Sequence, residues 1–239
     1  MFIHAVGIQK SYRNKTVVHN IDLDIRENDI LAVIGPNGAG KSTMLEMLIG
    51  LRTADSGEIN YWDRAFKEKM GVQLQAVPFF PNLSAFENLK LFAAFYKKKS
   101  SNDQITSALK MCGLNEVGKT DASKLSGGQQ KRLAISIALI HDPELILLDE
   151  PTAALDPRAR QEIHAIIKEL HQSGKTVVFT SHDMDEVDKL ATRVILINEG
   201  KIIAQGEPRQ LCKEYNVTKL EELYLILTQE EVEYVANNF

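Results

Sequence analysis

The pattern of apolar and polar residues along the chain predicts two kinds of β-structure. Ile21, Leu23 and Ile25 alternate with aspartates, and the same spacing returns at Ile59 and Tyr61. A period of two marks strands that are buried on one face, so the first sixty residues predict an antiparallel edge sheet. Other apolar runs are continuous, as expected for parallel strands covered on both faces. These runs lie at 30–34, 145–148, 176–180 and 194–197.

Helical spacing dominates two other regions. Polar helical stretches from about 86 to 125, with a lysine run at 97–99 that we interpret as a solvated face, indicate an inserted helical subdomain. Near the C-terminus, apolar residues recur at helical spacing opposite Glu221 and Glu222, which predicts a short amphipathic tail helix. The apolar positions are Leu220, Leu223, Tyr224 and Leu227.

A glycine-rich loop follows the first continuous run. Residues 35–42 fit G-x-x-x-x-G-K-[ST], and the next apolar residues predict a packed helix that ends at Gly50. In such a P-loop, backbone N–H groups cradle the phosphates of ATP, Lys41 reaches the β- and γ-phosphates, and Ser42 ligates Mg²⁺. The alternative is a glycine turn in a βα unit that binds nothing. The predicted nucleotide-binding residues are Gly35, Pro36, Asn37, Gly38, Ala39, Gly40, Lys41, Ser42 and Thr43.

A second candidate phosphate site lies in the middle of the chain. Ser126, Gly127, Gly128 and Gln129 stand just before the apolar run at 133–140, so they are expected to open a helix. Free N–H groups and the helix dipole favour an anion at such a position. One nucleotide rarely needs two phosphate loops from the same chain.

Asp149 and Glu150 close the run at 145–148. Sites in parallel sheets form at the carboxyl ends of the strands, so these carboxylates are candidate catalytic groups. Asp149 is expected to hold Mg²⁺, directly or through water, and Glu150 to orient and polarise the attacking water. The neighbouring glutamate favours hydrolysis over transfer to a substrate hydroxyl. The alternative is an exposed acidic turn before Pro151.

Composition narrows the range of partners. The net charge of −4 and the pI of about 5.9 leave no basic footprint, so nucleic acid is not an expected partner. Cys112 and Cys212 lie far apart without metal-like spacing, which suits a reducing cytosol. The sequence starts without a basic leader and contains no run as long as a membrane span. We therefore expect no secretion signal, and membrane contact only through a partner.

The order of these motifs resembles the ATP-binding-cassette family over nearly the whole chain. The resemblance implies an α/β fold with a P-loop NTPase core: a mostly parallel sheet flanked by helices, an N-terminal antiparallel β-subdomain and an inserted α-helical subdomain. It places the RecA-like core with its β-subdomain at about 1–85 and 126–215, the helical subdomain at about 86–125 and an amphipathic tail at about 216–239. The ordered set is Tyr12, the P-loop at 35–42, Gln75, the signature loop at 125–130, the segment 147–150, the segment 154–156 and His182.

The resemblance further implies a head-to-tail dimer, in which each ATP is held by the P-loop of one subunit and the signature loop of the other. Tyr12 is similar to the aromatic residue that stacks on adenine. Asp156 resembles the acidic residue of the loop that communicates across the dimer.

Two more residues take roles at the γ-phosphate from the same resemblance. Gln75 is similar to the loop glutamine that senses Mg²⁺ and the γ-phosphate, and Gln73 is its rival two residues earlier. His182 resembles the histidine that contacts the γ-phosphate and holds Glu150 in place. Because His182 follows the run at 176–180, we expect Ser181 to begin the helix at 183–190.

The loop after Gln75 carries Phe79, Phe80 and Leu83. In transporter cassettes the corresponding region borders a groove that receives a short helix of the membrane subunit, whereas packing on the chain's own helical subdomain is the alternative. Segments 71–75 and 219–228 are similar to those of exporter-type cassettes.

The implied function is therefore ATP hydrolysis that drives a membrane exporter. Its implied partners are a second ATPase subunit, identical or not, and separate permease subunits, and its implied location is cytoplasmic, on the inner face of the cell membrane. The rival function is a soluble mechanical ATPase that acts on ribosomes or DNA, but no sustained heptad pattern lies between Lys41 and Leu125. A P-loop kinase conflicts with the signature loop and Glu150.

Overall fold

The computed structural model describes residues 1–76, 78–96 and 101–236, with side chains described as far as Thr228. The chain folds into two compact units. The terminal unit comprises Met1–Trp62 and Thr180–Phe239, and the central unit comprises Asp63–Phe179. The subdomain boundaries expected near 85, 126 and 215 remain predictions.

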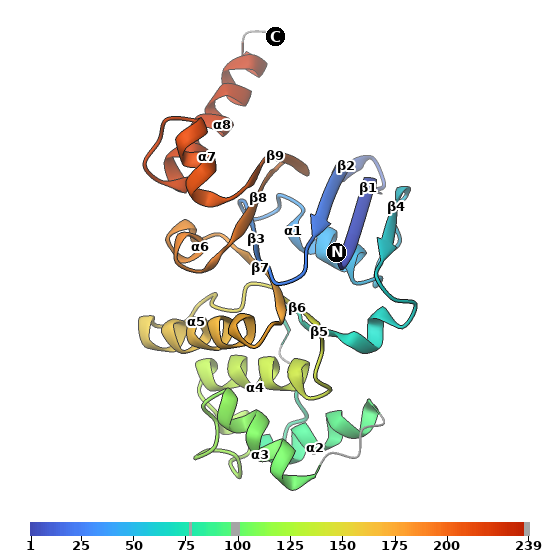
Figure 1. The fold of residues 1–239 in the computed structure, drawn as a ribbon, viewed down its shortest axis with the longest axis vertical. Coiled ribbons are helices and arrows are strands. Elements are labelled where there is room, and N and C mark those ends of the chain that lie inside the picture. Colours follow the sequence, from blue (N-terminus) through green and yellow to red (C-terminus); the bar gives the residue numbers. More distant parts are fainter. Residues whose placement is uncertain (77, 97–100, 237–239) are drawn as a thin grey trace. The chain divides into compact units, whose positions relative to one another are not determined.

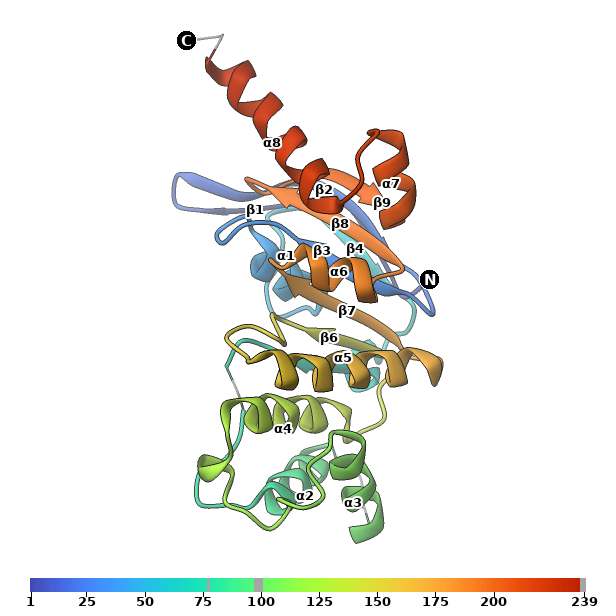
Figure 2. The ribbon, with the colours of Figure 1, turned by 90° about the vertical axis from the view of Figure 1, so that its left-hand side faces the viewer.

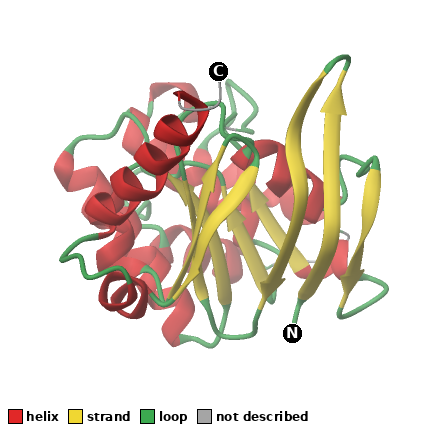
Figure 3. Cartoon of the chain, turned by 90° about the horizontal axis from the view of Figure 1, so that it is seen from above, coloured by secondary structure: helices red, strands yellow, loops and turns green. Residues whose placement is uncertain are grey.

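An antiparallel sheet of three strands belongs to the terminal unit. β1 (Ile3–Tyr12) is its middle strand, between β2 (Lys15–Ile25) and β4 (Ser56–Tyr61) (Figure 1; Figure 3). Alternate residues of β2 at 21, 23 and 25 are buried, and the aspartates between them are more exposed. The predicted edge sheet is confirmed.

The same unit contains two buried strands formed by continuous apolar runs and a partly exposed strand beside them. β3 (Ile30–Ile34) pairs in parallel with β8 (Arg193–Asn198), and β9 (Lys201–Gly206) returns antiparallel to β8. Every residue of β3 is buried, as the absence of alternation in its sequence predicts. The helices of this unit are α1 (Lys41–Leu48), α6 (Met184–Leu190), α7 (Pro208–Glu214) and α8 (Leu220–Ala236).

Among the described residues, the central unit combines parallel strands, the last of which ends in the terminal unit, with all the remaining helices. β5 (Met70–Gln73), β6 (Leu145–Leu148) and β7 (Thr176–Ser181) are parallel neighbours, and all of β6 is buried. The expected mostly parallel α/β fold is confirmed. The helices are α2 (Ala85–Phe95), α3 (Asn102–Met111), α4 (Gly127–Leu139) and α5 (Pro157–Gln172), with short 3₁₀ turns η1 (Phe66–Lys69) and η2 (Ala122–Lys124).

Helices α2, α3 and α4 begin with the same local device. Ser84, Ser101 and Ser126 each accept a hydrogen bond from the backbone N–H three residues later, and the side chain at that later position accepts from the serine N–H. This capping box satisfies N–H groups that no helix can satisfy internally. The lysine run at 97–99, which we interpreted as a solvated face, lies outside the described residues.

The predicted start of α6 at Ser181 is wrong by two residues. Ser181 is the last residue of β7 and is buried, and its hydroxyl accepts from Asp183 N (3.0 Å) and donates to Glu186 Oε2 (2.8 Å). Asp183 is the residue that caps α6, because its carboxylate accepts from Glu186 N at 3.1 Å. Serine and aspartate both suit a cap, and the sequence did not separate them.

The C-terminal helix is present but longer than the short helix that we expected. α8 spans 17 residues, and Leu220 and Leu223 are fully buried in the terminal unit. Leu225 and Ile226 are exposed, so its apolar residues are not confined to one face.

Candidate functional site

The P-loop of the terminal unit needs glycine at two positions for steric reasons. It connects β3 to α1, and a Cβ atom at Gly35 would overlap the carbonyl oxygen of Ile197. A Cβ at Gly40 would overlap the carbonyl of Val17, and Gly40 has a φ of 99°, which L side chains rarely adopt. The backbone of the loop therefore packs so closely against its neighbours that no side chain fits at either position.

Lys41 is the first residue of α1 and its ammonium group is held against this loop. The side chain is buried and donates to the carbonyls of Gly35 (2.9 Å) and Pro36 (3.1 Å). The intervening residues 36–38 are exposed, and Ser42 and Thr43 follow in the first turn of the helix. A cation, a bare backbone and a helix N-terminus together fit a polyphosphate.

Tyr12 and His182 also belong to the terminal unit. Tyr12 is exposed at the end of β1, with Arg52 Cζ 5.3 Å and Lys10 Nζ 5.9 Å from its ring centroid. Its ring is thus already stabilised by two cations. His182 is exposed directly after β7. The adenine contact of Tyr12 and the γ-phosphate contact of His182 remain predictions.

In the central unit, the two candidate glutamines differ sharply. Gln73 is buried in β5, and its amide donates to the carbonyls of Leu74 and, at 3.5 Å, Asp149. Gln75 lies two residues beyond the strand and is exposed. Its exposure supports our preference for Gln75 as the ligand-sensing glutamine, which stays a prediction.

Asp149 and Glu150 follow the end of β6. Asp149 is buried, and its backbone N–H donates to the carbonyl of Gln73 at 2.8 Å. Glu150 is half-buried, with a φ of 48° in the left-handed region. Its carbonyl accepts a hydrogen bond of 3.2 Å from Lys131 Nζ on α4. Burial lowers the pKa of Lys131, and the charges of Glu150 and Asp149 oppose that shift.

The signature loop forms the N-terminus of α4. Ser126 is the N-cap, with Gln129 completing the capping box, and both Ser126 and Gly127 are exposed. A Cβ at Gly127 would meet open space, whereas a Cβ at Gly128 would lie 2.8 Å from Ala159 Cβ on α5. Gly127 therefore leaves a bare surface, and Gly128 permits close packing of two helices (Figure 2).

Asp156 is the N-cap of α5. Its Oδ1 atom accepts from Ala159 N (3.0 Å) and Arg158 N (2.9 Å), and Pro157 occupies the first helical position. The Ala159 N–H, opposed by partial desolvation and aided by the Arg158 N–H, lowers the pKa of this carboxyl group. Asp156, the residue expected to communicate across a dimer, therefore also stabilises the start of α5.

Several contacts of the central unit join residues that are distant in the sequence. Lys131 and Arg132 follow the signature loop, and Arg132 forms an ion pair of 2.7 Å with Glu162 on α5. His141 stacks on Tyr96 at a centroid distance of 3.9 Å. The partners of Arg132 and His141 lie 30 and 45 residues away in the chain, so no local pattern could have indicated them.

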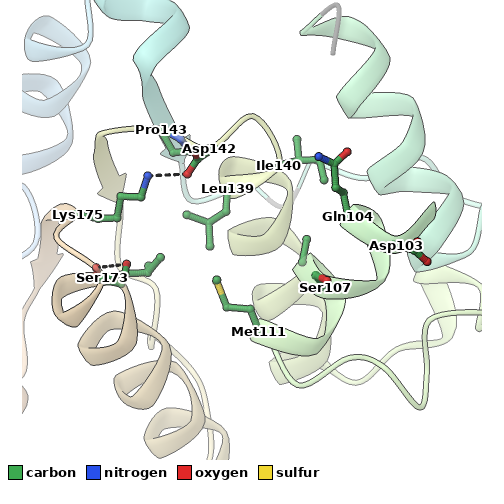
Figure 4. Close-up of a pocket in the computed structure, with 12 residues that line it drawn as sticks. Asp103, Gln104, Ser107, Met111, Leu139, Ile140, Asp142, Pro143, Ser173 and Lys175 are labelled. Carbon is green, nitrogen blue, oxygen red and sulfur yellow. Dashed lines mark hydrogen bonds and ion pairs between the residues drawn. The ribbon is translucent and has the colours of Figure 1, made fainter. Parts of the chain in front are cut away.

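A hollow of about 740 Å³ lies elsewhere in the central unit, between α3, the end of α4 and the end of α5 (Figure 4). Its lining includes Gln104, Met111 and Leu139, with the Lys175–Asp142 ion pair (2.6 Å) at its side. It contains no residue that the sequence predicted for the site. No cluster of three or more potential metal-binding His, Cys, Asp or Glu side chains occurs among the residues that the structure describes.

In the structure, the P-loop joins a strand to a helix, the signature loop opens a helix, and Asp149 and Glu150 follow the end of a strand, as the motifs predict. A family sequence model described as "ABC transporter" matches residues 18–153. The chain belongs to the ABC transporter family. It is an ATP-binding ATPase of that family.

Similar proteins include three bacterial ATP-binding proteins that match over most of this chain. The linearmycin resistance ATP-binding protein LnrL of Bacillus subtilis is 36% identical over 88% of this chain and 70% of its own length. The lantibiotic transport ATP-binding protein SrtF of Streptococcus pyogenes is 37% identical over 91% of this chain and 93% of its own. The spermidine/putrescine import protein PotA of Vibrio cholerae is 34% identical over 89% of this chain but only 59% of its own length.

Solved ABC structures share the fold. A dimeric ATP-binding cassette in a post-hydrolysis state with ADP and Pi has a TM-score of 0.77 and 29% identity, covering 86% of this chain and 98% of its own. cbiO1 of Clostridium perfringens, part of the ABC transporter complex cbiONQ, has a TM-score of 0.79 and 28% identity, covering 90% and 91%. Within the described ranges, none of the helices combines the length and hydropathy that a membrane span requires.

Proposed function

We propose that this ABC ATPase drives export of a substrate through separate membrane subunits, and that closure of an ATPase dimer on ATP supplies the force. The observation that carries the proposal is the presence, in one chain, of a P-loop and an exposed signature helix N-terminus. Relatives named for linearmycin resistance, lantibiotic transport and Nod factor export favour export, although an import protein also matches. These relatives favour a transporter over a ribosome- or DNA-directed ATPase.

The proposed dimer is head to tail, either of two identical chains or of this chain and a similar one. Each ATP is held by the P-loop of one subunit and by Ser126, Gly127 and Gly128 of the other. The open space at Gly127 and the exposure of Ser126 and Gly127 support this role, because the N–H groups at this helix start point away from the rest of the helix. A dimeric structural relative with ADP and Pi supports the dimer.

Hydrolysis needs a base, a charge sensor and a metal ion. Glu150 orients the attacking water, and His182 and Gln75 respond to the γ-phosphate. Ser42, Gln75 and Asp149 offer the hydroxyl, amide and carboxylate oxygens that suit Mg²⁺, which would neutralise charge on the phosphates. The buried Asp149 and its half-buried neighbour Glu150 fit a division between holding the metal and activating water.

The membrane partner is proposed to dock near the loop after Gln75, which places the ATPase at the cytoplasmic face of the membrane. Phe80 supports both options that the sequence left open. Its ring lies 5.8 Å from Phe92 and 6.4 Å from Phe95 of α2, and Phe80 and Phe95 nevertheless stay exposed. The aromatic cluster packs on its own helix and still offers apolar surface.

The test is Glu150→Gln. The variant should lose at least about 99% of ATP turnover, keep ATP binding, and accumulate a nucleotide-bound dimer, measured by phosphate release and gel filtration. Unchanged hydrolysis would rule out the assignment of Glu150. Transport by inside-out vesicles that contain the copurifying permease would decide direction, because an exporter takes substrate into such vesicles.

A further inference from the structure

The side chain of Lys131 contacts the backbone of the residue proposed to activate water. Lys131 Nζ donates to the carbonyl oxygen of Glu150 at 3.2 Å. The N–H of Ala153 donates to the same oxygen at 3.3 Å. The carbonyl is thus held by one donor from its own turn and one from a helix 19 residues earlier in the chain.

The backbone of Glu150 needs such support. Its φ of 48° lies in the left-handed region, where a Cβ atom crowds the carbonyl oxygen of its own residue. A glutamate stays there only when the surrounding structure determines its conformation. Because φ and ψ set the direction of the Cα–Cβ bond, a relaxed backbone would re-aim the carboxylate.

The helix that carries Lys131 packs closely against α5. Lys131 lies on α4, whose next residue, Arg132, forms a 2.7 Å ion pair with Glu162 of α5. One turn earlier, Gly128 lets α4 approach Ala159 of α5 closely. Lys131 is half-buried, and this partial burial lowers the pKa of its ammonium group. A hydrogen bond from a desolvated cation is stronger than one in water.

We propose that Lys131 is a positioning residue that fixes the catalytic carboxylate of Glu150 in its own subunit, and thereby joins the signature helix to the site of water activation. This inference rests on the proposed role of Glu150. The signature loop of α4 serves the partner's ATP, so a single helix links the two nucleotide sites of the dimer.

The first test measures ATP hydrolysis by Lys131→Met, which keeps the length of the side chain and removes the donor. We expect kcat to fall between about 10-fold and 100-fold with KM for ATP changed less than about twofold, because a misaimed base affects chemistry and not binding. Lys131→Arg should restore much of the rate. Lys168→Met, an exposed lysine on α5, is the matched control and should behave as the unaltered protein.

Glu150→Gln separates failure of this inference from failure of the proposed function. If Glu150→Gln is inactive and Lys131→Met hydrolyses ATP at the normal rate, Lys131 does not position the glutamate. If Glu150→Gln keeps its activity, the proposed function itself fails. A parallel rise in KM and loss of kcat in Lys131→Met, without rescue by arginine, would also overturn the positioning role.

Mixed dimers show on which site Lys131 acts. When Lys131→Met is in one subunit and Ser126→Arg in the other, both lesions damage the same ATP site, so one site stays intact. When both substitutions are in one subunit and the partner is unaltered, each site has one lesion. We expect several-fold higher turnover from the first arrangement, with Glu150→Gln and Ser126→Arg dimers as the reference. Equal turnover, or the reverse order, would contradict action on the subunit's own Glu150.

Discussion

Among single residues, the glycines of the P-loop differ in what they contribute. Gly35 and Gly40 face backbone carbonyls so closely that no side chain fits, whereas a Cβ at Gly38 would meet no heavy atom within 4 Å. Gly38 does have a φ of 83°, so it is required only for its conformation. The motif specifies glycine at 35 and 40 but any residue at 38, and the structure agrees, because a side chain would overlap the backbone only at the two specified positions.

Gly40→Ala should therefore be more damaging than Gly38→Ala. We expect a loss in the free energy of unfolding of about 2–4 kcal/mol for Gly40→Ala, from backbone strain plus overlap with Val17, and about 1 kcal/mol for Gly38→Ala. Urea denaturation measures both, and fluorescent ATP binding should fall further in Gly40→Ala. Equal losses would show that the loop can move away from Val17.

Cys112 is expected to resist chemical modification in the folded protein. Burial raises the pKa of its thiol to about 12, so at pH 8 the reactive thiolate is nearly absent. Iodoacetamide should label it slowly in buffer and quickly in urea, as read by mass spectrometry. The raised pKa also makes the free energy of unfolding depend on pH. The unfolded chain releases this proton from pH 9, whereas the folded chain keeps it until about pH 12. The contribution of Cys112 to stability is therefore complete below pH 9 and decreases as the pH rises toward 12. Rapid native labelling would contradict its burial.

Among the helices and strands, those with a regular pattern of apolar residues, either alternating or continuous, were predictable from the sequence. The alternation in β2 and the unbroken runs of β3 and β6 reflect burial on one or two faces, which the sequence records directly. The start of α6 was not predictable from the sequence, because Ser181 and Asp183 can both cap a helix. Burial of Ser181 in the folded protein decided between them. The local form of the phosphate loops was predictable from motifs, but the Lys131 contact depends on a distant turn.

The capping boxes provide a test at the level of one helix. Ser101→Ala removes the acceptor of the Gln104 N–H (3.2 Å) and should lower the free energy of unfolding by about 1 kcal/mol. Ser107→Ala, an exposed position inside the same helix, is the control and should change stability by less than about 0.5 kcal/mol, because alanine is the better helix former. Thermal unfolding of both variants decides whether the cap or the loss of a hydroxyl matters.

At the scale of the whole molecule, the two compact units divide the motifs between them. The P-loop, Tyr12 and His182 belong to the terminal unit, and Gln75, the signature loop, Asp149 and Glu150 belong to the central unit. Composition and motif order indicated the family, but neither could indicate that division. In the proposed dimer, each ATP is held by the P-loop of one subunit and the signature loop of the other.

Ser126→Arg tests that dimer. The variant should lose at least about tenfold in ATP hydrolysis, while the monomer's affinity for ATP changes little, because this loop serves the nucleotide of the other subunit. Ser126→Ala is the control for the lost cap of α4 and should keep more activity than the arginine variant. Isothermal titration at a concentration where the protein is monomeric measures the affinity. An equal loss of affinity and turnover would place both loops on one ATP.

The close approach of α4 and α5 has a consequence for how this sequence can vary. A methyl group added at Gly128 would lie 2.8 Å from the Cβ atom of Ala159, so the two positions share room for one side chain. Related chains should therefore show covariation between them, with glycine at the second position wherever the first is larger. Position 159 belongs to none of the motifs described above, yet the size of its side chain limits which residues the signature loop can carry at position 128.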